Sequence, residues 1–192
     1  MNGSESAAVL VVDDEPDVAD AYAAQLQAEY DVSTAYGGQA VIDSINDAIG
    51  VVLLDRRMPG VSGDDVLEYI REEELDCRVA MVTAVDPDFD IIGMPFDDYV
   101  IKPVSRDDLF ETIGRLLNIS DYQSTLQKFY ALSAKHATLR SNKPESELAD
   151  SDEFDGLTER MNELRSELDE QIAGFDDTDF ETAFRDLGTV ED

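Results

Sequence analysis

The chain has 192 residues, enough for one domain of ordinary size and an appendage. Its 45 acidic residues outnumber its 14 lysines and arginines and give a net charge of −31, while 43% of the residues are hydrophobic. That hydrophobic share supports a packed core and excludes a fully disordered chain. The acids are spread along the chain, which predicts a solvated acidic surface adapted to concentrated salt and disfavours loose binding to nucleic acid or anionic membrane in dilute buffer.

Several features bear on the compartment. Cys77 is the only cysteine, so no internal disulfide can form, and such a residue is more often a small buried side chain than a reactive thiol. No apolar run approaches the roughly 20 residues of a membrane span. Residues 1–6 lack the basic start of a secretory signal. We therefore expect a cytoplasmic protein without membrane contact.

Short apolar runs alternate with helical patterns over residues 7–118. The first run, Ala8–Val12, ends at Asp13-Asp14-Glu15-Pro16, where acids and an early proline favour a helix to about residue 29. Further strands are predicted at 31–35, 51–54, 78–82 and 99–101, with helices near 39–48, 64–74 and 105–117. Prolines and a glycine leave room only for a short helix near 87–93. This alternation predicts an α/β fold of the flavodoxin-like type, a doubly wound parallel sheet of five strands.

The pattern changes over residues 119–187. Ser120 with Gln123 matches a capping box, which predicts a new helix from there to about residue 140. A polar loop is expected at 141–152, and then a helix whose apolar stripe consists of Phe154, Leu157, Met161, Leu164, Leu168 and Ile172. Thr178 and Glu181 predict one more capped turn. We expect the two long helices to form a hairpin, or a coiled coil between subunits.

Polar residues stand where the predicted strands end. Parallel strands present their carboxyl ends at one edge of a sheet, so Asp13, Asp14, Asp55, Thr83 and Lys102 should gather there. Carboxylates brought together repel unless a cation lies among them, and hard oxygen ligands with room for water suit Mg²⁺. Lysine adds a second positive charge, and the threonine hydroxyl can bond a phosphoryl oxygen. The set predicts a cradle for a transferred phosphoryl group, with Asp55 as nucleophile and the aspartate pair holding the metal.

Four ordered motifs carry a family resemblance: VVDDEP at 11–16, LLDRRMPG at 53–60, VTA at 82–84 and DYVIKP at 98–103. Together they resemble the receiver domain of two-component response regulators over about 118 residues. The resemblance implies that Asp55 is the phosphoacceptor and Asp14 a direct Mg²⁺ ligand. It also implies that Asp13 assists through water and that the backbone carbonyl of Arg57 completes the protein ligands.

The same resemblance implies a switch and a donor. Thr83 would move toward the acyl phosphate and draw Tyr99 inward, while Lys102 pairs with the phosphate. The donor would be a histidine kinase, and the Lys102–Pro103 bond would be cis. One departure is that Thr83 and Lys102 are closer in sequence than the family pattern implies. This shortening puts in doubt the dimerisation that many relatives achieve through the adjoining face.

Two arginines follow the expected phosphoacceptor. Arg56 and Arg57 could tune the phosphate lifetime or the choice of partner, or only offset local negative charge. The other reading of the whole site is a Mg²⁺-dependent phosphohydrolase acting on external substrates. Such an enzyme would need a general acid two residues after the nucleophile, and Arg57 at that position is not an acid near neutral pH. The sequence therefore favours a signalling protein over an enzyme.

Residues 119–187 resemble the HalX segment found after receivers of salt-loving archaea, on their layout and on the fragment 126–132. Residues 120–192 contain seven basic and 19 acidic residues and no helix-turn-helix signature, so a DNA-binding output is disfavoured. We expect instead a downstream protein target or a homodimer through the C-terminal helices. His136, the sole histidine, is expected to be an ordinary helix residue because no other metal ligands accompany it.

Overall fold

A computed structural model describes residues 7–175 and 179 and divides the chain into two units, Met1–Leu117 and Asn118–Asp192. The first unit contains β1 (Ala8–Val12), α1 (Pro16–Leu26), β2 (Asp31–Ala35), α2 (Gly38–Ser44), β3 (Val51–Leu54), α3 (Gly63–Glu72), β4 (Arg78–Thr83), the 3-10 helix η1 (Phe89–Gly93) and β5 (Asp98–Ile101). Helix α4 (Arg106–Asn142) begins in the first unit and ends in the second, where α5 (Glu145–Ala149) and α6 (Asp152–Ile172) follow. Within the described residues no helix is both long and apolar enough to cross a membrane.

All five strands are parallel and lie in the order β2-β1-β3-β4-β5. This is the predicted flavodoxin-like sheet, and the prediction of its fold class is confirmed. The central strands β3 and β4 are buried along their whole length, as expected for strands covered on both faces.

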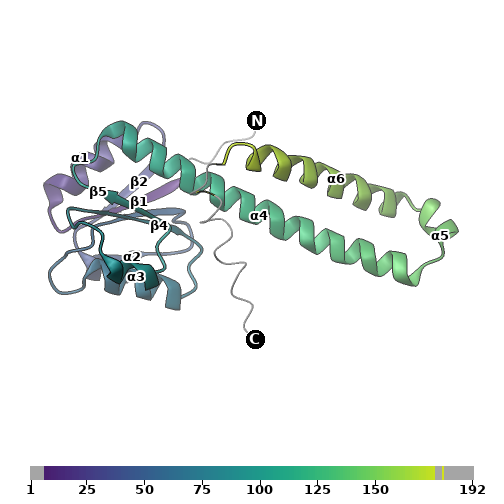
Figure 1. Cartoon of the computed structure of the whole chain (residues 1–192), viewed down its shortest axis with the longest axis horizontal. Coiled ribbons are helices and arrows are strands. Elements are labelled where there is room, and N and C mark those ends of the chain that lie inside the picture. The colour runs from purple at the N-terminus through teal and green to yellow at the C-terminus, as the bar shows by residue number, and fades with distance from the viewer. Residues whose placement is uncertain (1–6, 176–178, 180–192) are drawn as a thin grey trace. The chain divides into compact units, whose positions relative to one another are not determined.

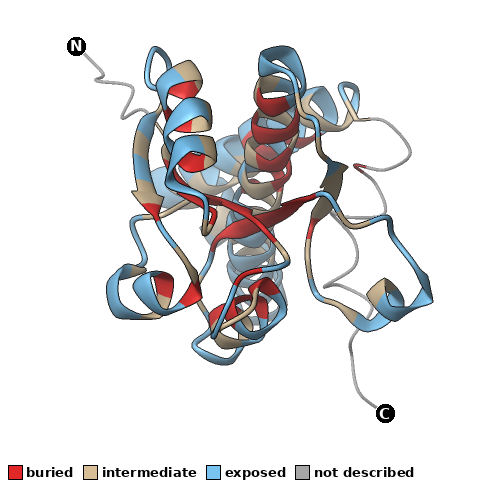
Figure 2. Ribbon diagram, turned by 90° about the vertical axis from the view of Figure 1, so that its left-hand side faces the viewer, coloured by how far each residue is buried: buried red, intermediate tan, exposed pale blue. Residues whose placement is uncertain are grey.

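Helices cover both faces of this sheet (Figures 1 and 2). Alternate residues of a strand point to opposite faces, so Val9 and Val11 belong to one core and Leu10 and Val12 to the other. The core under Val9 and Val11 is closed by α1 and the first turns of α4, and the other core by α2 and α3. Figure 2 shows the buried residues concentrated in the strands and on the inward faces of these helices.

The predicted helix start at Ser120 is wrong, because α4 runs through this position without a break. The apolar residues Ile113, Leu116, Ile119 and Tyr122 follow one another at three-residue spacing and are all buried. No glycine or proline interrupts residues 115–143. A capping-box pattern stabilises a helix only where the chain enters one, and here the chain is already helical. The cap lies instead at Ser105, whose hydroxyl accepts from the Asp108 N–H while the Asp108 carboxylate accepts from the Ser105 N–H.

In the second unit α4 and α6 pack as the predicted hairpin. Ile119, Tyr122 and Leu168 form its buried cluster. Further along the hairpin, the ring of His136 stacks on Phe154 at 4.8 Å between centroids. The expected loop at 141–152 contains the short helix α5. The turn predicted around Thr178 and Glu181 lies outside the described residues.

A buried carboxylate fixes the start of β5. Asp97 is 8% exposed, and its two oxygens accept from Arg71 at 2.8 Å and from Arg78 at 3.0 Å. The Val79 N–H donates to the same carboxylate at 2.8 Å. Since a buried charge is costly without such partners, this network ties the end of the β4–β5 connection to α3 and to β4.

Candidate functional site

Polar side chains from four strands meet at the carboxyl edge of the sheet. Asp13 directly follows β1, Asp55 follows β3, Thr83 ends β4 and Lys102 follows β5. The parallel register brings the ends of these strands to nearly the same level. Side chains distant in sequence therefore lie within contact distance.

The loop after β3 is pressed closely against the start of α3. A Cβ built on Gly63 would lie 2.2 Å from the backbone carbonyl oxygen of Asp55, so no other residue fits there without a backbone shift. The Gly63 N–H donates to the Arg56 carbonyl at 2.9 Å and closes this loop. The glycine thus fixes the backbone that presents the Asp55 side chain.

The ammonium group of Lys102 joins two carboxylates. Its Nζ donates to Oδ2 of Asp13 at 2.6 Å and to Oδ1 of Asp55 at 3.1 Å. The two aspartates are buried, with 2% and 7% of their surfaces exposed. Two carboxylates held this close in a partly desolvated site repel, and the shared ammonium offsets that repulsion.

Backbone N–H groups bind the remaining oxygens of these carboxylates. The Glu15 N–H donates to Oδ1 of Asp13 at 2.9 Å, and the Arg57 N–H donates to Oδ2 of Asp55 at 3.1 Å. Burial raises the pKa of Asp55, and Lys102 only partly counteracts it. Burial lowers the pKa of Lys102, but its bonds to Asp13 and Asp55 outweigh burial and raise this pKa overall, so the ammonium stays charged at neutral pH.

Thr83 and Tyr99 are connected through one backbone residue. The Val85 N–H donates to Oγ1 of Thr83 at 3.3 Å, and the Tyr99 hydroxyl donates to the Val85 carbonyl at 2.8 Å. Thr83 is 1% exposed, whereas Tyr99 is half-buried and packs against Phe96 at 5.5 Å between ring centroids. Movement of the threonine hydroxyl would therefore disturb the segment that holds the tyrosine.

The oxygen donors present suit a hard cation. Asp14 is half-buried next to Asp13, and the carboxylate of Asp55 and the backbone carbonyl of Arg57 are the other expected ligands. Across residues 7–175 and 179, no group of three acidic, histidine or cysteine side chains is arranged to hold a metal by itself. Mg²⁺ normally keeps several water ligands and takes only a few from the protein, so this donor set fits Mg²⁺ better than a metal that needs a full side-chain cage.

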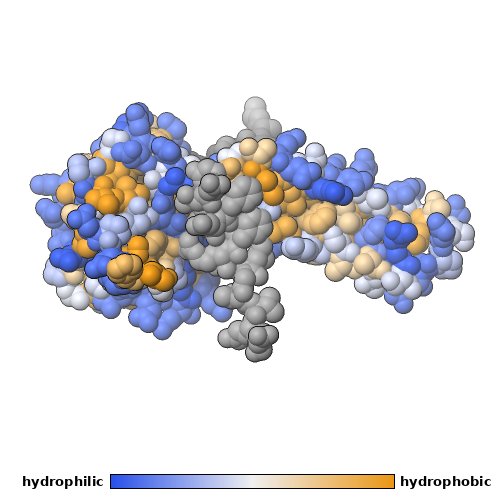
Figure 3. Space-filling view, in the orientation of Figure 1, coloured by the Kyte–Doolittle hydropathy of each residue, from blue (hydrophilic) through white to orange (hydrophobic). Residues whose placement is uncertain are grey.

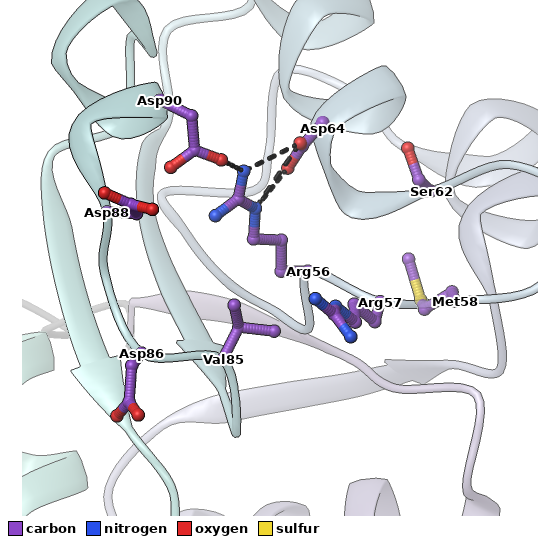
Figure 4. Close-up of a pocket in the computed structure, with 9 residues that line it drawn as sticks. All are labelled: Arg56, Arg57, Met58, Ser62, Asp64, Val85, Asp86, Asp88 and Asp90. Atoms are coloured by element: carbon purple, nitrogen blue, oxygen red, sulfur yellow. Dashed lines mark hydrogen bonds and ion pairs between the residues drawn. The ribbon is translucent and has the colours of Figure 1, made fainter.

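Next to this site lies a pocket of about 500 Å³ (Figure 4). Arg56 extends into it from the loop after β3 and bonds two carboxylates from different elements. Its Nε donates to Asp64 in α3 at 3.1 Å, and its Nη2 donates to Asp90 in η1. The exposed guanidinium of Arg57 forms no ion pair with any described residue. The sequence left open whether these arginines tune the phosphate lifetime or the choice of partner, or only offset negative charge. The ion pairs show that Arg56 offsets the charge of Asp64 and Asp90.

Three members of this neighbourhood escaped sequence reasoning: Asp64, Asp90 and Val85. The two aspartates carry no distinguishing pattern in so acidic a chain. Val85 connects Thr83 with Tyr99 through its backbone groups, which leave no trace in the choice of side chain. By contrast, the bond between Lys102 and Pro103 is cis, as the family resemblance implied.

A parallel five-stranded sheet with acids, a threonine and a lysine at its carboxyl edge defines a receiver-type architecture. The sequence model of the response regulator receiver domain family matches residues 9–114, more than half of the chain. The sequence model of the HalX domain family matches residues 118–184. The chain therefore belongs to the response regulator receiver family and carries a HalX domain after the receiver.

Three relatives illustrate the likeness. A candidate transcriptional regulator of Haloferax volcanii is 48% identical over 165 residues, which cover 85% of this chain and 28% of that protein. Response regulator SaeR of Staphylococcus aureus is 34% identical over 113 residues, 57% of this chain and 50% of SaeR. The crystal structure of response regulator TrrA of Thermotoga maritima in complex with Mg²⁺-BeF matches with a TM-score of 0.50 and 31% identity, covering 57% of this chain and 98% of TrrA. The chain thus spans at most half the length of these two curated relatives.

Proposed function

We propose that this protein is a phosphorylation-controlled switch in which Asp55 accepts a phosphoryl group from a histidine kinase. The observation that carries the proposal is the ammonium of Lys102, which contacts both Asp13 and Asp55 at the strand ends. Membership of the receiver family supports it, because a phosphate-accepting aspartate is what this family would place at the end of the third strand. The protein would be a cytoplasmic signalling component and not an enzyme acting on a metabolite.

In the transfer, an Oδ atom of Asp55 attacks the phosphorus of a phosphohistidine. The new P–O bond forms as the P–N bond breaks, and the imidazole nitrogen keeps the electron pair. Lys102 would leave its carboxylate contacts to pair with a phosphoryl oxygen, and the Thr83 hydroxyl would donate to another. Catalysis of this kind consists mostly of positioning and charge neutralisation, which these strand ends provide.

Mg²⁺ would be held by Asp14, by Asp55 and by the backbone carbonyl of Arg57, with Asp13 assisting through water. The crystal structure of the TrrA relative is that of a complex with Mg²⁺-BeF, which supports the same cofactor here. When bound, the ion supplies positive charge that offsets the phosphoryl oxygens. Asp13 is already engaged by Lys102 and by the Glu15 N–H, which is consistent with the less direct role assigned to it.

Phosphorylation would then shift a conformational equilibrium. Thr83 would exchange its contact with the Val85 N–H for one with the phosphate, and Tyr99 would lose or change its bond to the Val85 carbonyl. The HalX segment would transmit the new state through contacts with a protein. The name of the Haloferax relative favours a second output, control of transcription, which the acidic C-terminal region supports less well.

The test is a mass measurement after incubation with Mg²⁺ and acetyl phosphate. We expect a base-labile adduct with the mass of one phosphoryl group on the wild-type chain and none on Asp55→Asn. Removing Mg²⁺ with a chelator should abolish the adduct, and Lys102→Gln should slow its formation by about tenfold to a thousandfold. Unmodified wild-type protein, or equal modification of Asp55→Asn, would contradict the proposal.

A further inference from the structure

The two long helices of the HalX hairpin carry opposite charge. Between residues 118 and 143, four basic residues (Lys128, Lys135, Arg140 and Lys143) stand against a single acid, Asp121. Helix α6 contains eight carboxylates and two arginines. A local excess of positive charge is unexpected in a chain whose net charge is −31.

This opposite charge is not used inside the hairpin. Lys128, Lys135 and Arg140 are exposed, and none of them forms an ion pair within the described part of the chain. Two ion pairs of this unit join residues close in sequence, Lys143 with Glu147 and Arg160 with Glu163. The positive charge of Lys128, Lys135 and Arg140 therefore remains available to a partner, whereas Glu163 already pairs with Arg160 of its own helix.

The basic residues share a helix face with leucines. Lys128, Leu132, Lys135 and Leu139 follow at spacings of four, three and four, which places them in one stripe along α4, here called the basic stripe. Leu139 is 36% exposed and Leu132 half-buried. Figure 3 shows hydrophobic residues on the surface of this hairpin as well as between its helices. The stripe offers apolar contact area flanked by ammonium groups.

Two contacts fix the level of α6 relative to α4. Thr125 donates to Glu167, and His136 stacks on Phe154. Because the two helices run antiparallel, each step toward the C-terminus along α4 corresponds to one step toward the N-terminus along α6. Lys128 then lies level with Glu163, and Lys135 lies level with Gly156. On an α-helical wheel, Glu163, Glu167 and Gly156 lie on the flank of α6 that adjoins the basic stripe. Arg160 lies on the same flank and pairs with Glu163, and the two glutamates leave this flank of α6 with a net negative charge. One side of the hairpin is thus basic on α4 and net acidic on α6.

We propose that this side of the hairpin binds the same side of a second copy, with α4 of each chain packed against α6 of the other. A two-fold axis parallel to the helices places Lys128 opposite Glu163 and Glu167 of the partner chain and preserves their level. The alternative two-fold arrangement would set α4 against α4, basic stripe against basic stripe, and is opposed by like charge. Charge complementarity therefore favours a second copy of this chain as the partner, and it favours the arrangement that pairs α4 with α6.

Gly156 supports a close approach at this side. It lies inside α6, where glycine lowers helix stability, and a Cβ built on it would meet nothing within 4 Å. The hairpin by itself does not require a glycine there. In the proposed dimer, the partner's basic stripe crosses α6 at the level of Gly156, where the missing side chain lets the helices approach.

The proposal is tested by light scattering of the full chain in about 1 M KCl, where the Debye length is about 3 Å and repulsion between distant charges is screened. We expect the wild type to have the mass of a dimer. The double variant Lys128→Glu, Lys135→Glu should have the mass of a monomer. The double variant Glu163→Lys, Glu167→Lys should also be a monomer. All four changes in one chain should restore the dimer, and so should mixing the two double variants. Circular dichroism checks that each variant keeps its helices.

Gly156→Leu gives a steric test that leaves net charge unchanged. It should fold as a single chain, because the hairpin has space for the added side chain, and its dimer should dissociate at a concentration at least tenfold above that of the wild type. A one-chain mass for the wild type, or a persistent dimer after reversal of the basic stripe, overturns the proposal. Binding of DNA by a monomeric wild type also overturns it, if Lys128→Glu with Lys135→Glu abolishes that binding. Asp55→Asn should dimerise like the wild type, so this result is separable from the proposed phosphoryl transfer.

Discussion

At the residue scale, burial and charge act in opposite directions on Asp55. The side chain lies between the ammonium of Lys102 and the carboxylate of Asp13, and burial raises its pKa above the usual value of 3.8. A raised folded-state pKa means that the protonated form favours folding. This contribution is fully present below the usual pKa and is lost as the pH rises through the folded-state value. In neutral, metal-free solution the ionised Asp55 therefore costs stability.

Asp55→Asn removes that cost. In metal-free buffer at about pH 7 we expect the variant to be more stable than the wild type, and we expect the difference to vanish below the usual pKa of 3.8. Urea unfolding over a pH series measures this. Asp47→Asn, which removes an exposed carboxylate, serves as the control and should change stability little at any pH. An Asp55→Asn variant less stable than the wild type at neutral pH would show that Lys102 outweighs burial.

Arg56 and Arg57 form a matched pair for a second test at this scale. Both carry one positive charge, but only Arg56 bonds Asp64 and Asp90. Arg56→Ala should open η1 and raise amide exchange at residues 89–93 by about fivefold, since η1 loses the ion pair between Asp90 and Arg56. Arg57→Ala should leave that exchange unchanged. Equal effects of the two substitutions would mean that the charge near η1 matters and the bonds do not.

At the scale of elements, the strands and their polar ends were predictable because each depends on a local pattern. A buried parallel strand is a short apolar run, and the residue after it reaches the functional edge whatever the rest of the chain does. Asp97 could not be found in this way. Its burial depends on two arginines that come from α3 and β4, and nothing near Asp97 in sequence marks it among the other acids.

Helix α4 shows a related limit. The serine patterns at Ser120 and Ser105 look alike in sequence. They differ in the chain before them, which is non-helical before Ser105 and already helical before Ser120. Three-residue spacing of buried residues from Ile113 to Tyr122 carries the helix through Ser120. A local cap signal therefore cannot be interpreted without the apolar stripe that surrounds it.

The two serines make this difference measurable. Ser105→Ala should lower the free energy of unfolding by about 1 kcal/mol, because it removes the hydroxyl that accepts from the Asp108 N–H. Ser120→Ala should be neutral or slightly stabilising, because alanine is the better residue in a helix interior. Urea unfolding of both variants gives the comparison. If Ser120→Ala lowered the free energy of unfolding as much as Ser105→Ala, this would indicate that a new helix begins at Ser120 after all.

At the scale of the whole molecule, the net charge of −31 sets the conditions under which the fold is stable. The described ion pairs are few, and several involve exposed side chains that contribute little. Most acids therefore repel one another across water without a nearby cation. This repulsion is long-range at low salt, where the Debye length is about 10 Å at 0.1 M, and is confined to contact distance at molar salt.

We therefore expect the melting temperature to rise by about 5 °C or more between about 0.1 M and 2 M KCl. A variant with Asp47→Asn, Glu73→Gln and Asp76→Asn, three exposed positions, should melt higher than the wild type at low salt and gain less from KCl. Thermal unfolding of both proteins over the salt series measures the effect. If salt acted only through apolar burial, the two curves would rise in parallel, because the substitutions leave the core unchanged. Convergence of the curves at high salt would identify surface repulsion as the term that salt removes, and the same screening would allow two such acidic chains to approach through their HalX hairpins.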